Sequence, residues 1–435
     1  MAEAMHAPTS SFAAREPALS AAPGAYDWVI VFLVGTLMTL GAVIVYSASV
    51  SIDAPAMNWQ QWWRTPLRQG VFAVAAFVLM ALVARTDYRA WAWDEPGQGW
   101  RAGGWALLAG LLLIIVLIPG VGAERLGAQR SFSLRLGQVA LSFQPSELAK
   151  PALILWLAAL LTRPRARVDD VTRGYLPALG SAGLLIGLTV IEDFGTAALM
   201  GVVAMAMLFW AGARWLHLGV TALVGLVAGL ALVLLEPYRW QRVITFFSAN
   251  PDPQREGYQV NQALIAIGSG GWLGRGLGAG VQKYDYLPQD NNDFILAILC
   301  EELGIAGGLA VIALFLLLLW RGWLISRRAP DAFGRLLAGG LTLTICLQAA
   351  FNIGVVTNSI PTKGISLPFV SAGGSGLLFL GVAAGLLAAV GGRATSRDTS
   401  RDTSRDTSRD TSRDTSRDTS RDTSRDTSRE RKRAT

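Results

Sequence analysis

Ten runs of about 15 to 25 apolar residues recur along this chain of 435 residues, and no other feature limits its possible folds as strongly. A helix needs about 20 apolar residues to cross a bilayer core, and fewer where flanking side chains snorkel. Residues 1–27 lack the basic start of a signal peptide, so the first run is expected to be retained. The runs lie near 28–49, 69–84, 103–120, 146–162, 175–191, 194–213, 215–235, 293–320, 336–360 and 373–390. The sequence therefore predicts an all-α, polytopic integral membrane protein with about ten transmembrane helices.

The amino-acid composition supports the class of integral membrane proteins and argues against nucleic-acid binding. The chain is 52% hydrophobic and 16% charged, against roughly a quarter charged in a soluble domain. The segment from Arg393 to Thr435, mostly a TSRD repeat, carries 13 of the 38 Lys and Arg residues and 9 of the 31 Asp and Glu residues. The pI of 9.7 therefore owes much to this tail, and nucleic-acid binding is not indicated.

Loop charge and loop length divide the chain into three parts. With a cytoplasmic N-terminus, the inner loops carry twelve Arg residues and the short outer loops carry six Lys and Arg, which favours both termini inside. We therefore predict a cytoplasmic segment 1–27, a membrane domain 28–392 and a disordered cytoplasmic tail 393–435. The membrane domain includes one long extracytoplasmic loop, 236–292, whose eight aromatic residues suggest a packed, functional segment.

Cysteine and histidine are too scarce for several kinds of site. Cys300 and Cys346 lie within apolar runs, and His6 and His217 are the only histidines. A disulfide framework, a thiolate metal site, His-ligated zinc and a His-activated nucleophile are all disfavoured. Any chemistry must rest on carboxylates, Lys, Arg and the backbone.

Two acidic motifs lie next to spans, where ionisable side chains are costly. Glu147 and Lys150 open the fourth span three residues apart, so they share a helix face. They can form an internal ion pair or contact a substrate. Glu192 and Asp193 separate two spans, where they can cap the next helix or face a cavity.

Asp293 ends the long loop, directly before an apolar run. It can serve as a helix N-cap, or as a general base at the outer membrane surface. If Asp293 lies on the following helix, Glu301 is about 80° away and Glu302 about 180° away, so only Glu301 could point into the same cavity.

Two glycine-rich segments interrupt the spans. In the segment 268–280 no strand precedes the glycines, so a dinucleotide-binding loop is rejected in favour of flexible or closely packed backbone. The segment SAGGSG, 371–376, is expected to be non-helical backbone that lines a cavity.

Four blocks together resemble the SEDS family of polytopic cell-wall polymerases, whose branches are FtsW, RodA and SpoVE. The blocks are LSFQPSELAKPALILWLA, EDFGTAALM, the segment from RWQRVITFF to CEELG, and VVTNSIPTKGISLPFVSAGGSG. They occur in order between about Gly127 and Gly376, and IPTKGISLPFVS is most similar to the FtsW, or division, branch.

The resemblance implies a peptidoglycan glycosyltransferase that polymerises lipid II on the outer membrane face, in septal cell-wall synthesis. It places the catalytic Asp of the family on Asp293. Gln289, Asn291, Asn292 and Ala372 depart from the family pattern, and Ser131 stands where the family usually has Trp. The reaction inverts the sugar linkage, so one base suffices.

The remaining implied site residues are cations and polar groups on the outer side. Cations are needed to hold the leaving pyrophosphate, and Arg130 and Lys363 are the first candidates, with Arg275 and Lys283 also available. The full set of expected substrate-binding residues is Arg130, Lys150, Glu147, Arg242, Gln259 and Lys363. A divalent cation, Mg²⁺ or Mn²⁺, could share the task of holding the pyrophosphate, but no acidic cluster in the sequence specifies a metal site, so no cofactor is assigned.

The resemblance also implies partners and a location. These are lipid II, membrane lipid, a class B penicillin-binding transpeptidase and other divisome proteins, in the inner (cytoplasmic) membrane at the division septum. Two rival functions stay open: a lipid II flippase, because of the broken helices and membrane carboxylates, and a non-catalytic divisome scaffold, because of the altered residues before Asp293.

Overall fold

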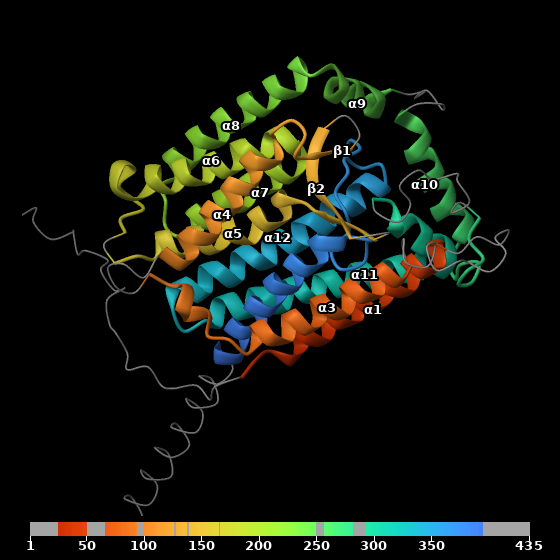
Figure 1. The fold of residues 1–435 in the computed structure, drawn as a ribbon, viewed down its shortest axis with the longest axis horizontal. Helices are drawn as coiled ribbons and strands as arrows, with labels where there is room; N and C mark the ends of the chain where they lie inside the picture. The colour runs from red at the N-terminus through yellow and green to blue at the C-terminus, as the bar shows by residue number, and fades with distance from the viewer. Residues whose placement is uncertain are drawn as a thin grey trace, which may run out of the picture.

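The computed structural model is a bundle of helices that lie side by side, elongated along a common axis (Figure 1). It describes residues 25–49, 66–93, 100–125, 128–136, 139–164, 166–248, 256–281 and 293–394. The long helices are α1 (Trp28–Ser49), α3 (Pro66–Ala84), α4 (Trp100–Val116), α5 (Pro145–Leu161), α6 (Leu176–Glu192), α7 (Phe194–Trp210), α8 (Trp215–Leu235), α11 (Ile295–Arg328), α12 (Ala332–Val356) and a last helix, Gly374–Ala394.

Each of the ten predicted apolar runs coincides with one of these helices, so the predicted class is confirmed. Within the described residues, seven helices are long and apolar enough to cross a membrane. Two further apolar helices, α4 and α7, are somewhat shorter, and α5 is also 17 residues long but carries Glu147 and Lys150. The protein is a multi-pass membrane protein.

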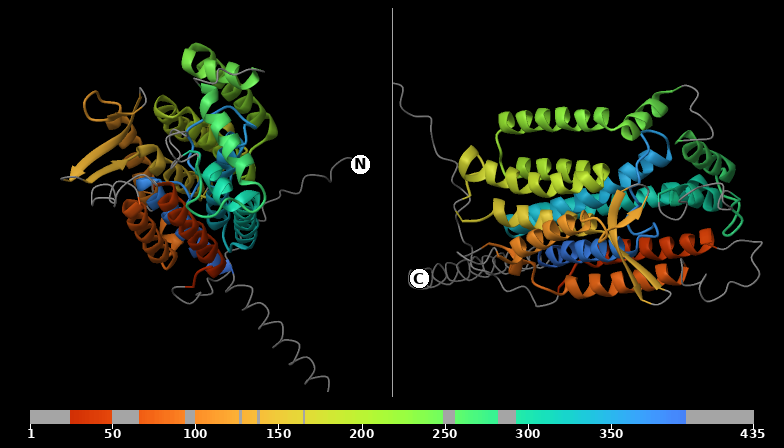
Figure 2. Two further views of the ribbon diagram at one scale, coloured as in Figure 1. Left: turned by 90° about the vertical axis from the view of Figure 1, so that its right-hand side faces the viewer. Right: turned by 45° about the horizontal axis from the view of Figure 1, so that its top comes forward.

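One end of the bundle carries most of the structure outside the long helices, and we call it the site end. Here lie α9 (Pro237–Phe247), α10 (Glu256–Gly270) and three short strands (Figures 1 and 2). Residues from the N-terminal ends of α3, α5 and α7 and the C-terminal part of α12 meet at this end. The helices therefore alternate in direction, as consecutive membrane spans joined by short loops must.

A small antiparallel sheet precedes α5, and the sequence analysis did not predict it. Its strands are β1 (Ala123–Arg125), β2 (Ala128–Leu136) and β3 (Val139–Phe143), in the order β1-β2-β3. Phe132 pairs with Phe143 in the register of β2 and β3. The alternation of apolar and polar residues from Ser131 to Leu136 is a strand signal, but it is short beside the apolar runs. The sheet adds to the all-α class without changing it.

The long loop 236–292 is partly helical where the structure describes it. In α10, Val260, Ala263 and Ala266 are buried. In α9 no residue is buried, and the Phe247 side chain is 78% exposed. The prediction of a packed segment therefore holds for α10 and is wrong for α9.

The glycine-rich segment packs its backbone directly against α11. A Cβ atom on Gly270 would lie 2.0 Å from the Cys300 carbonyl oxygen, and one on Gly274 would lie 2.1 Å from the Glu302 carbonyl oxygen. The Gly276 amide donates a hydrogen bond to the same Glu302 carbonyl. Of the two interpretations left open for this segment, close packing is the one observed.

We expect Gly274→Ala to destabilise the protein more than Gly276→Ala. Both glycines have positive φ angles, 80° and 101°, where a side chain costs about 1–3 kcal/mol. Only at Gly274 would the new methyl group also collide with the backbone of α11, because nothing lies within 4 Å of a Cβ on Gly276. Thermal unfolding in detergent should show the larger loss for Gly274→Ala, and equal losses would contradict the packing argument.

Ion pairs tie the helices together at the other end of the bundle. Arg321 of α11 contacts Asp27 at 2.6 Å, and Arg89 contacts Asp331 at 3.3 Å. The Tyr88 hydroxyl donates to the same Asp331 carboxylate at 2.6 Å. Burial, together with the Asp331 charge, raises the pKa of Tyr88 above its ordinary value. These contacts lie at the end of the bundle opposite to the site end.

Candidate functional site

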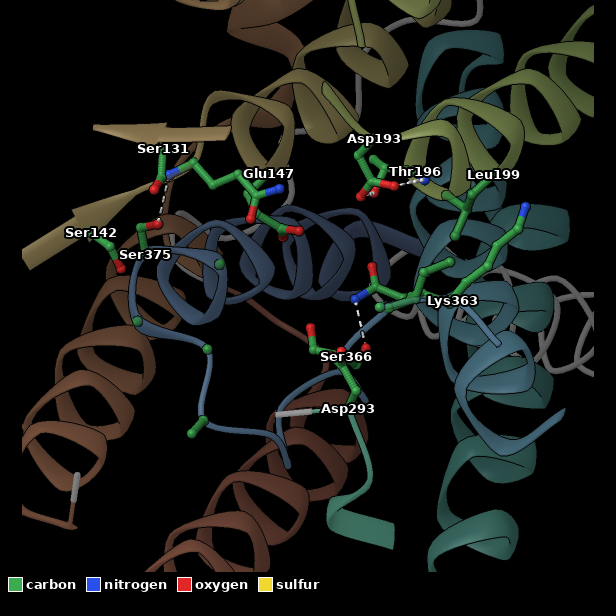
Figure 3. Close-up of a pocket in the computed structure, with 18 of the residues that line it drawn as sticks. Ser131, Ser142, Glu147, Asp193, Thr196, Leu199, Asp293, Lys363, Ser366 and Ser375 are labelled. Carbon is green, nitrogen blue, oxygen red and sulfur yellow. Dashed lines mark hydrogen bonds between the residues drawn. The ribbon is translucent and has the colours of Figure 1, made fainter. Parts of the chain in front are cut away.

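A polar pocket of about 480 Å³ opens at the site end of the bundle (Figure 3). Residues far apart in the sequence line it, because the ends of several long helices meet there. Six of the seven predicted site residues line this pocket: Glu147, Lys150, Arg242, Gln259, Asp293 and Lys363. The seventh, Arg130, lies in β2, but its side chain falls outside the described part of the chain. Its neighbour Ser131 lines the pocket.

Glu147 and Lys150 form the predicted ion pair. Pro145 opens α5, and Glu147 lies in its first turn, where the helix dipole favours an acidic side chain. The Lys150 Nζ atom lies 2.9 Å from the Glu147 carboxylate and also donates to Gln348 Oε1 at 2.7 Å. The Lys150 side chain is only 4% exposed. Glu147 and Lys150 therefore form an ion pair and also line the pocket, whereas from the sequence these two roles are alternatives.

Asp193 likewise combines its two possible roles. Its Oδ1 atom accepts hydrogen bonds from the amides of Gly195 at 2.9 Å and Thr196 at 3.2 Å, so it caps α7. The same side chain lines the pocket, and Figure 3 shows it beside Thr196.

Asp293 lies in the turn before α11 and is not its N-cap. The helix begins at Ile295, and Phe294 occupies the cap position without a side-chain hydrogen bond. The Asp293 carboxylate lies beside the 357–373 connection, since a Cβ atom on Gly364 would be 3.0 Å from Asp293 Oδ2. In Figure 3 Asp293 and Ser366 occupy one side of the pocket, with Glu147 and Asp193 across from them.

The expectation that Glu301 could share the cavity with Asp293 is wrong. The Glu301 Oε1 atom accepts a hydrogen bond from the Val281 amide at 2.8 Å, and Glu301 does not line the pocket. The helical angle of 80° assumed that Asp293 lies on the helix. Because α11 begins two residues later, that projection does not apply.

Lys363 lies among aromatic and charged side chains. Its Nζ atom is 4.3 Å from the centre of the Phe194 ring, a cation–π distance. Burial lowers the pKa of Lys363 below its ordinary value; Asp193 opposes this shift, and the positive charges of Arg239 and Arg242 add to it. Any additional negative charge placed in the pocket would therefore stabilise the charged form of Lys363.

Arg242 reaches the pocket from α9. One of its terminal nitrogens donates to the Thr362 carbonyl oxygen at 3.1 Å, next to Lys363, and the other donates to the Tyr238 hydroxyl. Its guanidinium group also lies 4.6 Å from the centre of the Tyr238 ring. These contacts hold α9 against the connection that carries Lys363.

Two other cations named from the sequence have different positions. Arg275 is absent from the pocket lining; its Nη1 atom lies 3.8 Å from the Glu301 carboxylate, and its Nε donates to the Ser269 carbonyl oxygen. Lys283 lies outside the described residues, as do Gln289, Asn291 and Asn292. Ala372 lines the pocket, together with the glycines of the SAGGSG segment.

Several pocket residues were not predicted from the sequence. Arg68 enters from α3, Ser142 from β3, and Gln348 from α12. Gln348 carried a usable signal, because a carboxamide within a membrane-spanning run is costly unless it has a partner. Ser142 of β3 carried no such signal, because serine is common in loops and strands alike.

The described lining of the pocket contains no cage of metal-ligating side chains. Among the described residues, no group of three or more His, Cys, Asp and Glu side chains could hold a metal ion. Such a group would be needed to hold a metal by protein side chains alone, and we assign no step of the mechanism to a metal.

The fold and the pocket together define a polytopic membrane protein with a polar, cation-rich site at one end of its helices. Residues 27–396 match the FtsW/RodA/SpoVE family model, described as cell cycle protein. The chain belongs to this family, the one that its motifs resemble.

Relatives of known name match over most of the chain. Stage V sporulation protein E of Bacillus subtilis (strain 168) is 40% identical, over 83% of this chain and 95% of the relative. A probable peptidoglycan glycosyltransferase FtsW of Alkalilimnicola ehrlichii is 42% identical, over 83% of this chain and 88% of the relative.

Solved structures share the fold. A chain from a peptidoglycan synthase complex that coordinates polymerization and crosslinking has a TM-score of 0.65 and 31% identity, over 85% of this chain and 98% of that one. The Thermus thermophilus rod shape determining protein RodA has a TM-score of 0.58 and 30% identity, over 86% of this chain and 97% of that one.

Proposed function

We propose that this protein is a peptidoglycan glycosyltransferase that polymerises lipid II into glycan strands, with Asp293 as the general base. The observation that carries the proposal is the convergence of the Asp293 carboxylate with Lys150, Arg242 and Lys363 around a single pocket. The names of the relatives support the reaction class, since several are named as probable peptidoglycan glycosyltransferases.

In this mechanism the acceptor sugar hydroxyl attacks the anomeric carbon of the donor. Asp293 takes the hydroxyl proton as the new C–O bond forms, a step worth about 10²–10⁴ in rate. The bond between the anomeric carbon and the pyrophosphate breaks, and the pyrophosphate leaves with the bonding electrons. Lys363, Arg242 and Lys150 stabilise its negative charge, so no acid is needed. One displacement inverts the configuration, as an α-linked donor and a β-linked product require.

We place this activity at the division septum, in the inner membrane, with the site end outward and both termini in the cytoplasm. The excess of Arg in the loops at the opposite end supports this orientation. The partners are lipid II, surrounding membrane lipid, a class B penicillin-binding transpeptidase and other divisome proteins. The likeness to a chain from a peptidoglycan synthase complex supports the transpeptidase partner.

The test is polymerisation by the full chain, purified with its transpeptidase partner and supplied with labelled lipid II. We expect glycan strands that resolve by gel electrophoresis. Reconstituted vesicles separate this function from the flippase alternative. A protein that moves lipid II across the bilayer, depends on Glu192 or Asp193 and makes no polymer would overturn the proposal.

The lowered pKa of Lys363 predicts a pH dependence of substrate binding. The charged ammonium group binds pyrophosphate, so binding weakens as the pH rises through the pKa of Lys363. Because this pKa is lowered, the KM for lipid II should rise at a lower pH than for an ordinary lysine. Lys363→Arg keeps its charge throughout and should remove this rise. KM measured between pH 7 and 10 for both proteins checks this, and identical profiles would contradict it.

A further inference from the structure

Two carboxamide side chains lie one turn apart on α12, a helix whose other residues are mostly apolar. Gln348 and Asn352 are each 1% exposed. A spacing of four residues puts them on the same face of the helix. Burying such groups costs several kcal/mol unless they are hydrogen-bonded. The hydrogen-bond partners of Gln348 and Asn352 therefore indicate which segments these side chains hold in place.

Asn352 joins two segments of the site. Its Nδ2 atom donates to the backbone carbonyl oxygen of Asp293 and to that of Ile365, both at 2.8 Å. The first carbonyl belongs to the turn before α11, and the second to the connection between α12 and the last helix. One side-chain amide thus fixes the peptide of the proposed base to the segment that faces it.

Gln348 holds the next residue of that segment. Its Nε2 atom donates to the Ser366 carbonyl oxygen at 3.0 Å, and its Oε1 atom accepts from Lys150 Nζ at 2.7 Å. Two consecutive carbonyls, those of Ile365 and Ser366, are therefore anchored to α12. Gly364 directly precedes them and lies against the Asp293 carboxylate.

We propose that Asn352 is a positioning residue that fixes the distance between the Asp293 carboxylate and the connection that carries Lys363. The inference rests on the proposed function of Asp293. Asn352 does not line the pocket, so it acts through Asp293 and not on the substrate. The α12 helix is well suited to this task, because most of its residues are buried and its position is set by packing on several sides.

The test replaces Asn352 with a residue of the same size. Asn352→Asp removes both N–H donors and places an oxygen opposite two carbonyl oxygens. We expect kcat to fall about 10- to 100-fold, since a misplacement of about 1 Å costs up to 10²-fold. The KM for lipid II should stay within about threefold, because Gln348 still anchors the connection that carries Lys363 through the Ser366 carbonyl.

Two further variants keep the test decisive. Asn352→Ser is uncharged and too short to reach both carbonyls, so it should also lower kcat, even if the Asp variant fails to accumulate. Asn358→Asp makes the same chemical change at an exposed residue just beyond α12, with an unusual φ angle of 53° that Asp also tolerates, and should keep wild-type kcat. Thermal unfolding and co-purification with the transpeptidase confirm that each variant is folded.

The outcomes separate this inference from the proposed function. Folded Asn352 variants with wild-type kcat, beside an inactive Asp293→Asn, would overturn the inference alone. A rise in KM as large as the fall in kcat would also overturn the inference, because substrate binding would then be disturbed. Wild-type turnover by Asp293→Asn itself would reject the proposed base.

Discussion

Replacing Asp293 with Asn is expected to lower the turnover of lipid II by about 10²–10⁴-fold, which is the usual contribution of a positioned general base. The Asn side chain has the same shape and can occupy the space beside Gly364, but it cannot accept the acceptor's proton. The KM should change little, because the cations that hold pyrophosphate are untouched. Single-turnover polymerisation of labelled lipid II measures the chemical step directly.

Asp170→Asn is a matched control for this experiment. Asp170 accepts hydrogen bonds from the amides of Thr172 and Arg173 in an exposed cap away from the pocket. Asn caps equally well, so both activity and stability should be retained. An Asp293→Asn protein that polymerises like the wild type would reject the base assignment. Full complementation of a depletion strain by a polymerisation-dead Asp293→Asn would instead favour the scaffold function.

Replacing Lys150 with Met should have the largest effect on stability. The Lys150 ammonium is nearly inaccessible and bonds to both Glu147 and Gln348. Its removal leaves a poorly solvated carboxylate without its cation, which costs about 3–5 kcal/mol in buried ion pairs. Thermal unfolding in detergent should show a large loss of stability for Lys150→Met.

The double variant Glu147→Gln with Lys150→Met separates structure from catalysis. Removing both charges together is often nearly neutral for stability, so most of the loss should be recovered. Polymerisation should stay low, because a cation that holds pyrophosphate is still missing. Recovery of both stability and activity would show that the pair serves folding alone.

The number and placement of the long helices could be predicted from the sequence. Each apolar run is long enough to decide its own structure, since a helix is the way a single segment satisfies its backbone in lipid. Elements outside the membrane were less predictable. The strands β2 and β3 depend on each other for hydrogen bonds, and α9 forms although no residue of it is buried.

For the site, the charged residues were within reach of sequence analysis, and their arrangement was not. Burial in lipid makes each Glu, Asp, Lys and Arg near a span costly, so residues such as Asp293, Glu147 and Lys150 draw attention singly. The sequence could not decide that Glu301 turns toward the glycine-rich segment and away from the pocket. The direction of the Glu301 side chain depends on the residue at which α11 begins, and tertiary contacts set the start of a helix.

By itself, then, the sequence determined a membrane bundle of about ten helices, its family and a short set of charged residues. Hydrophobic periodicity and charge are properties of local segments, and they survive any rearrangement of their neighbours. Only the tertiary structure decided that α5, α9, α12 and the 357–373 connection meet around Asp293. It alone gave Gln348 and Asn352 their partners, because hydrogen bonds between segments 13 to 198 residues apart exist only once the helices have packed.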